Sequence, residues 1–141
     1  MLYTNPKDWK NSKSKRVLLF GMSGLGKTYI SNLLREDGDW FHYSIDYRIG
    51  TRYMGEFISD SYKLAAMKTP YLGELLKSDS IYINSNITFD NLAPLSNYLG
   101  KPGNIVLGGI PIAEYQKRQE QHRKAEVCLL YTSDAADERN S

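Results

Sequence analysis

This sequence of 141 residues has one cysteine, a small net charge and no long apolar run. A single cysteine excludes a disulfide framework within the chain. No apolar run approaches the length that crosses a membrane, and the N-terminal stretch lacks the apolar centre of a secretion signal. The formal net charge of +2 is too small to favour nucleic-acid binding. These absences predict a cytoplasmic protein without membrane or nucleic-acid partners.

The apolar content is sufficient for a folded core. Hydrophobic residues make up 41% of the chain and aromatic residues 12%, which is typical of a globular domain. The length favours one domain. The composition therefore predicts one folded domain with an apolar core.

The stretch GMSGLGKT, from Gly21 to Thr28, has the spacing G-x-x-x-x-G-K-[ST]. Glycines let the backbone curl around a phosphate, the lysine bridges the outer phosphates, and the threonine hydroxyl ligates Mg²⁺. We therefore expect ATP and Mg²⁺ as ligands, Lys27 as a catalytic residue and Thr28 as the metal ligand. The expected nucleotide contacts are Gly21, Ser23, Gly24, Leu25, Gly26, Lys27, Thr28 and Tyr29.

Apolar runs and helical patterns alternate along the chain. Strands are expected at 16–20, 40–45 and 80–84, with Asp46 directly after the second. Helices are expected at 27–36, 48–68, 71–77 and 88–99, and from Ile112 onward. Thr69-Pro70 should interrupt the second helical region, and Gly100 should follow the end of the fourth helix. This order predicts an α/β fold with a parallel sheet.

Residues 15–52 resemble the small P-loop kinases, the shikimate kinase family in particular. After the phosphate loop, that family has the pattern D-x-D-x-x-I-E-x-R, and here the stretch is SIDYRIGTR. Asp46 and Arg52 match its second acid and its arginine, whereas Ser44 and Gly50 replace its first acid and its glutamate. The resemblance implies a three-layer parallel sheet of the P-loop kinase type. It also implies that Asp46 contacts an acceptor hydroxyl and that Arg52 contacts an acceptor carboxylate.

Two functions remain open from the sequence. The first is phosphoryl transfer from ATP to a small hydroxyl-bearing acceptor, with Asp46 as a catalytic and substrate-binding residue and Arg52 as a substrate-binding residue. The second is an ATPase switch that acts through a partner protein. The whole chain also resembles an uncharacterised bacterial family labelled only ATPase. Asp46 could instead cap the following helix, and Arg52 could be a solvated helix position.

The C-terminal stretch CLLYTSDAADERNS, from Cys128 to Ser141, resembles a translated sequencing adapter. Its first eleven residues match the translation of the transposase adapter used to fragment DNA libraries. We therefore expect three parts: a polar arm at 1–14, a partial nucleotide-binding domain at 15–127 and a non-native tail at 128–141. The kinase-type sheet would then be C-terminally truncated, and the tail would pack poorly beyond a short helical extension through Leu130.

Overall fold

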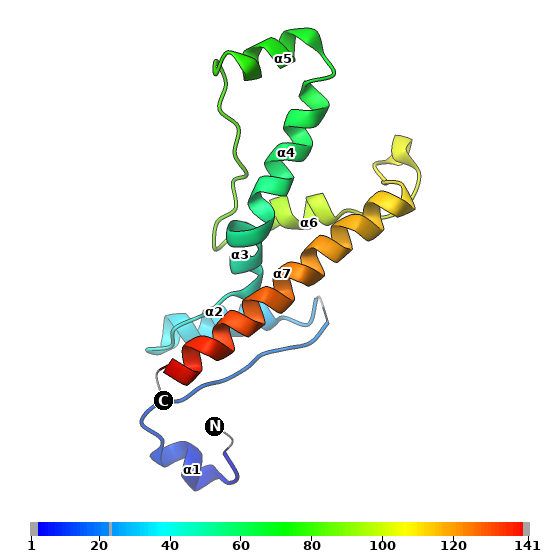
Figure 1. Ribbon diagram of the computed structural model, residues 1–141. Helices are drawn as coiled ribbons and strands as arrows, with labels where there is room; N and C mark the ends of the chain where they lie inside the picture. Colours follow the sequence, from blue (N-terminus) through cyan, green and yellow to red (C-terminus); the bar gives the residue numbers. More distant parts are fainter. Residues whose placement is uncertain (1–2, 23, 140–141) are drawn as a thin grey trace. The chain divides into compact units, whose positions relative to one another are not determined.

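The computed structural model describes residues 3–22 and 24–139, with side chains described as far as residue 131. The chain divides into two compact units, Met1–Tyr43 and Ser44–Ser141. Figure 1 labels the helices of both.

The expected parallel sheet is absent from the described residues, so the predicted α/β fold of the P-loop kinase type is wrong. The structure is 60% helical with 2% strand. Its pairing is one isolated parallel bridge between Pro102 and Ile110. The segments predicted as strands at 16–20, 40–45 and 80–84 have no strand partners within the described residues; they lie outside helices except for Ile45, which begins α3. Strand propensity reports how well a side chain packs on a pleated surface, so without neighbouring strands it does not produce a sheet.

The first unit contains two helices, α1 (Pro6–Asn11) and α2 (Lys27–Asp37). Residues 1–14 were expected to form an arm or loop, but Asn5 starts α1 as its N-cap. Its side-chain oxygen accepts hydrogen bonds from the N–H groups of Lys7 and Asp8. Proline at the first helical turn suits this position because its missing N–H would have no helical partner there. The expected helix at 27–36 is confirmed.

Aromatic rings link the two ends of the first unit. Trp9 of α1 stacks on Trp40, which follows α2, with 6.1 Å between ring centroids and 16° between planes. Tyr3 meets Trp9 edge-on at 5.0 Å. None of the described residues 3–43 falls in the fully buried class. The first unit is therefore held by half-buried aromatic contacts instead of a closed apolar core.

The second unit is also helical. Its elements are α3 (Ile45–Arg48), the π-helix η1 (Ile49–Met54), α4 (Gly55–Ala66), α5 (Pro70–Lys77), α6 (Ala93–Leu99), the 3-10 helix η2 (Ile105–Leu107) and α7 (Ile112–Arg139). The expected helical region at 48–68 and the break before Pro70 are confirmed. Gly100 ends α6 at a φ of 64°, a conformation that favours glycine.

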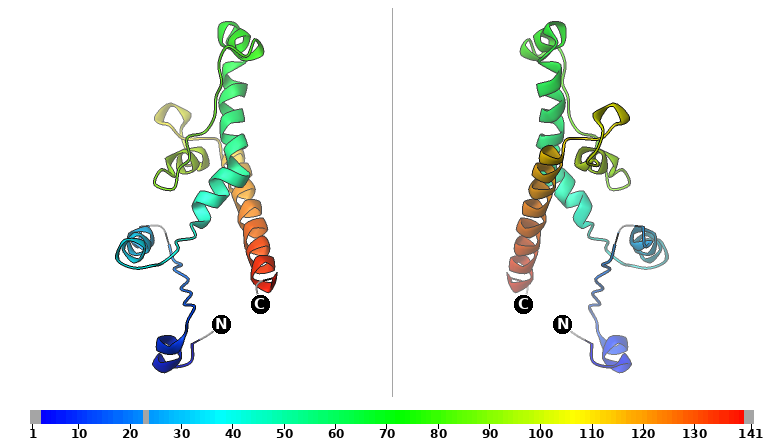
Figure 2. Two further views of the ribbon diagram at one scale, coloured as in Figure 1. Left: turned by 90° about the vertical axis from the view of Figure 1, so that its left-hand side faces the viewer. Right: turned by 90° about the vertical axis from the view of Figure 1, so that its right-hand side faces the viewer.

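The core of the second unit lies where α7 packs against α3, η1 and α6 (Figures 1 and 2). Its buried members are Ile49, Met54, Leu95, Tyr98, Ala125 and Leu129. They come from η1, α6 and α7, so residues far apart in the sequence close one small core. The unit rests on few fully buried side chains.

Helix α7 begins at Ile112 as expected and continues to Arg139. The helix was predicted to extend only through Leu130, and this is wrong, because α7 continues through most of the stretch predicted as a tail. Leu129, within the adapter-like stretch, is only 1% exposed and belongs to the core. Helical spacing explains this position, because Ala125 and Leu129 are four residues apart and share one face of α7.

Candidate nucleotide site

The loop before α2 has the backbone conformations that its glycines permit. Gly21, Gly24 and Gly26 have φ values of 154°, 84° and 77°. Side chains rarely adopt these values, because Cβ then meets the backbone. Gly26 is the N-cap of α2 and supplies no side-chain hydrogen bond to it. Ser23 lies outside the described residues.

The first turn of α2 presents backbone donors. Among the described residues, no hydrogen-bond acceptor meets the N–H groups of Lys27, Thr28 and Tyr29. That turn also contains no acidic side chain. Unsatisfied N–H groups and the helix dipole both favour an anion at a helix start.

Lys27 folds back across the loop. Its ammonium donates a hydrogen bond to the carbonyl oxygen of Met22 at 2.6 Å. An ammonium has three hydrogens, so this contact leaves donors for another acceptor. Thr28 and Tyr29 are exposed at the next two helix positions, and Leu25 is 66% exposed in the loop.

Asp46 and Arg52 belong to the second unit, whereas the loop belongs to the first. Asp46 was predicted to follow a strand, and this is wrong. It lies in the first turn of α3 and is exposed. The N-cap is Ser44, whose hydroxyl accepts a hydrogen bond from the Tyr47 N–H at 3.2 Å. The alternative that Asp46 itself caps the helix is therefore wrong, although a carboxylate in the first helical turn is stabilised by the dipole. A cleft shared by Asp46, Arg52 and the loop stays a prediction.

Arg52 lies in η1 and is exposed. Its guanidinium lies 5.8 Å from the ring centroid of the neighbouring Tyr53. This geometry is a cation–π contact. The π-helical backbone that carries Arg52 was not predicted, and such segments often occur at functional sites.

His42 is half-buried in the segment between α2 and α3. Burial lowers the pKa of its imidazole below the ordinary value of 6.5, and the nearby positive charge of Arg35 lowers it further. The neutral imidazole is therefore favoured in the folded first unit.

A polar cluster that was not predicted from the sequence lies between α6 and α7. Arg118 is 18% exposed at its side chain, and its Nε donates to Glu114 Oε1 at 2.9 Å. Its Nη1 donates to the Tyr98 carbonyl oxygen at 2.7 Å, and the guanidinium lies 4.5 Å from the Tyr98 ring centroid. The Tyr98 hydroxyl donates to Gln121 Oε1 at 2.8 Å. The spacing of Glu114 and Arg118 by four residues was the available signal.

A hollow of about 440 Å³ lies beside the loop that follows α6. Gly100, Gly103 and Gly108 have positive φ values there, and Lys101 is its charged lining residue. A Cβ at Gly109 would lie 2.5 Å from the Gly103 carbonyl carbon. Positive φ values at Gly100, Gly103 and Gly108 and close backbone approach at Gly109 thus explain the glycines of this loop without a ligand.

The residues described contain no group of three or more His, Cys, Asp or Glu side chains placed to hold a metal ion. Likewise, no helix in the described part of the chain is long and apolar enough to span a membrane. No protein-family model, curated protein or solved structure matches the chain. The site must therefore be judged on its own residues.

Proposed function

We propose that the loop Gly21–Gly26 and the start of α2 bind the phosphates of ATP. The observation that supports this most is the run of three N–H groups at Lys27, Thr28 and Tyr29 without an acceptor among the described residues. They follow a glycine N-cap in the left-handed conformation. A triphosphate supplies the several anionic oxygens that such converging donors require.

Lys27 is proposed as the side chain that neutralises the outer phosphates. Its ammonium already lies across the loop on the Met22 carbonyl, within reach of an anion held there. This contact orients the lysine before a ligand arrives, so little side-chain freedom is lost on binding.

Mg²⁺ fits the site as a companion of the nucleotide. Magnesium in phosphate sites uses few protein oxygens together with phosphate oxygens and water, and the exposed Thr28 hydroxyl is one such oxygen. No dedicated cluster of metal ligands exists in the described residues. The ion would neutralise phosphate charge when bound.

The proposed reaction is phosphoryl transfer to a small hydroxyl-bearing acceptor in the cytoplasm. Asp46 would accept the proton of the hydroxyl, and Arg52 would bind an acceptor carboxylate. These roles rest on the resemblance of SIDYRIGTR to the kinase pattern. Positioning and charge neutralisation provide most of the catalysis in such transfers.

An ATPase switch is the second candidate, because large apolar side chains are exposed next to the loop. Leu18, Phe20 and Met22 are 73%, 85% and 80% exposed. Exposed apolar clusters often mark protein-binding surfaces. Nucleotide binding at this loop would then control a partner instead of an acceptor.

Isothermal titration of the full chain with ATP and Mg²⁺ tests nucleotide binding. We expect binding by the unmodified chain and an affinity loss of about tenfold or more for Lys27→Ala, because a phosphate contact of an ammonium is removed. Lys13→Ala is the matched control, since Lys13 is exposed outside the loop, and its affinity should not change. Equal affinities for both variants would refute the phosphate site.

Asp46→Asn separates the two candidate reactions. In a phosphotransferase, this variant should lower acceptor-dependent turnover while ATP affinity stays unchanged, because the base is lost and the phosphate contacts remain. In a switch, ATP hydrolysis should proceed without an acceptor and should be insensitive to Asp46→Asn. Turnover measured with and without a panel of small hydroxy acids distinguishes these results.

A further inference from the structure

The extended segment Ile81–Ile87 has the burial pattern of a strand without being part of a sheet. Residues 83, 85 and 87 are half-buried, whereas 82, 84 and 86 are exposed. This alternation is the two-residue period of a strand with one covered face. The segment runs back from α5 beside α4 (Figure 1).

Two glycines allow this close approach to the helices. A Cβ at Gly50 would lie 3.1 Å from the Ile87 side chain, and one at Gly55 would lie 3.3 Å from the Ser85 hydroxyl oxygen. The face formed by 83, 85 and 87 is therefore held toward η1 and α4. These contacts involve the side chains of the segment, whereas its backbone N–H and C=O groups lie along its two edges.

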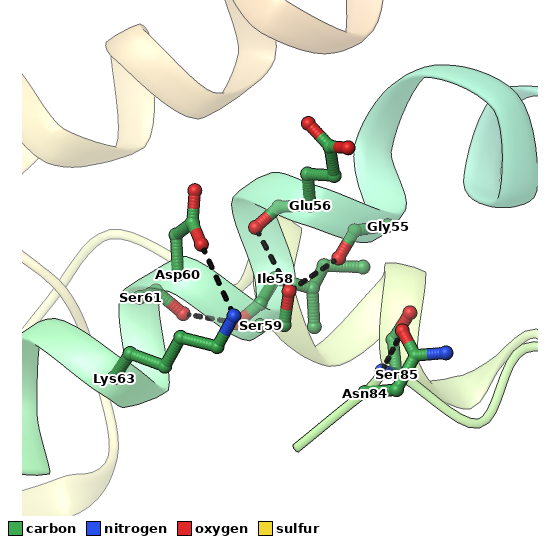
Figure 3. Close-up of polar contacts among 9 residues, drawn as sticks. All are labelled: Gly55, Glu56, Ile58, Ser59, Asp60, Ser61, Lys63, Asn84 and Ser85. Carbon is green, nitrogen blue, oxygen red and sulfur yellow. Dashed lines mark hydrogen bonds and ion pairs between the residues drawn. The ribbon is translucent and has the colours of Figure 1, made fainter. Parts of the chain in front are cut away.

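One edge of this segment offers a row of backbone groups for pairing. In a strand, the N–H and C=O groups of alternate residues point to the same edge. Within the described residues, the backbone groups of Ile83 and Ile87 make no hydrogen bond, and the Ser85 N–H is bonded only to the Asn84 side-chain oxygen at 2.9 Å (Figure 3). The opposite edge is already used by Asn91, whose side-chain amide donates to the Asn86 carbonyl at 3.0 Å.

We propose that this edge pairs antiparallel with the same segment of a second copy of the chain. A two-fold axis at Ser85 places Ile83 opposite Ile87 and Asn84 opposite Asn86. Apolar side chains then meet on the inner face and amides on the outer face. Such like-with-like pairs across strands are stabilising, and a two-fold interface requires this self-complementarity.

The charges at the ends of the segment are compatible with this register and oppose a slip of one residue. No charged residue lies between Asp79 and Asp90. The axis at Ser85 places Asp90 opposite Ser80 and Asp79 opposite Asn91, so the carboxylates face neutral groups. A slip of one residue would place Asp79 opposite Asp90 and would set inner-face residues against outer-face residues.

Cysteine cross-linking of the full chain tests the register. Asn84→Cys and Asn86→Cys are prepared separately, each with Cys128→Ser because Cys128 is exposed. In the proposed ribbon, position 84 of one copy lies opposite position 86 of the other, at a separation that a disulfide can bridge. We expect rapid intermolecular disulfide formation in the equimolar mixture and little in either variant alone. Equal cross-linking in all three samples would overturn the register.

Sedimentation equilibrium tests the dimer itself. We expect a reversible monomer–dimer equilibrium for the unmodified chain. Ser85→Pro should weaken it about tenfold because it removes a donor from the pairing edge in both copies, whereas Asn86→Pro should have little effect because its N–H points to the other edge. Far-UV circular dichroism verifies that both variants remain helical. A strictly monomeric unmodified chain, or equal effects of the two prolines, would overturn the proposal.

Discussion

Replacement of Leu129 by alanine should destabilise the second unit strongly. Leu129 is 1% exposed and packs with the core residues of η1 and α6. Leu-to-Ala changes in such positions cost about 2 to 5 kcal/mol, from lost apolar burial plus the cavity that remains. Because a domain is stable by only about 5 to 15 kcal/mol, this one change should remove a large share of the free energy of unfolding.

Urea denaturation followed by far-UV circular dichroism measures this effect. With a slope of about 1 to 3 kcal/mol per molar urea and a cost of about 2 to 5 kcal/mol, the midpoint should fall by at least about 0.7 M. Leu130→Ala is the matched control, because Leu130 is the next residue of α7 and is 48% exposed. Equal midpoints for the two variants would contradict the place of Leu129 in the core.

The remaining predictions concern a half-buried imidazole and a half-buried guanidinium. Because the folded pKa of His42 lies below its ordinary value of 6.5, the first unit should have its full stability above pH 6.5 and lose stability as the pH falls below it. Fluorescence of the two tryptophans, both in that unit, should report this loss, and His42→Gln should abolish the pH dependence. Arg118→Lys should cost about 1 to 2 kcal/mol, because one ammonium cannot replace both guanidinium hydrogen bonds and the ring contact. Arg123→Lys, at an exposed ion pair, should leave the urea midpoint unchanged; a similar loss for both arginine variants would contradict the role assigned to Arg118.

Local signals predicted the helices well. The apolar spacing after Gly26, the proline at the start of α5 and Gly100 after α6 each act within a few residues. Capping and backbone preferences of this kind can be read from neighbouring residues alone.

The strands were predicted wrongly because pairing is not a local property. The stretch from Trp40 is rich in aromatic and branched residues, yet Ser44 caps a helix that begins at Ile45. The Ser44 hydroxyl accepts a hydrogen bond from the Tyr47 N–H. Such a local contact between side chain and backbone starts a helix and thereby competes directly with strand formation. The Tyr98–Arg118 contact was likewise beyond the sequence, because it joins residues from separate helices.

The π-helix η1 fixes the rotational phase between the helices on either side of it. A π-helical turn holds more residues than an α-helical one, so η1 sets which side of α4 continues the side of α3 that faces α7. Deletion of Gly50 would remove the extra residue that the wide π-helical turn holds, so the backbone would close to α-helical geometry and leave the phase of α4 nearly unchanged. The extra residue of η1 is therefore accommodated locally, and deletion of one residue inside η1 should disturb the core less than deletion of one residue inside α4, where it would turn the following residues by about 100°.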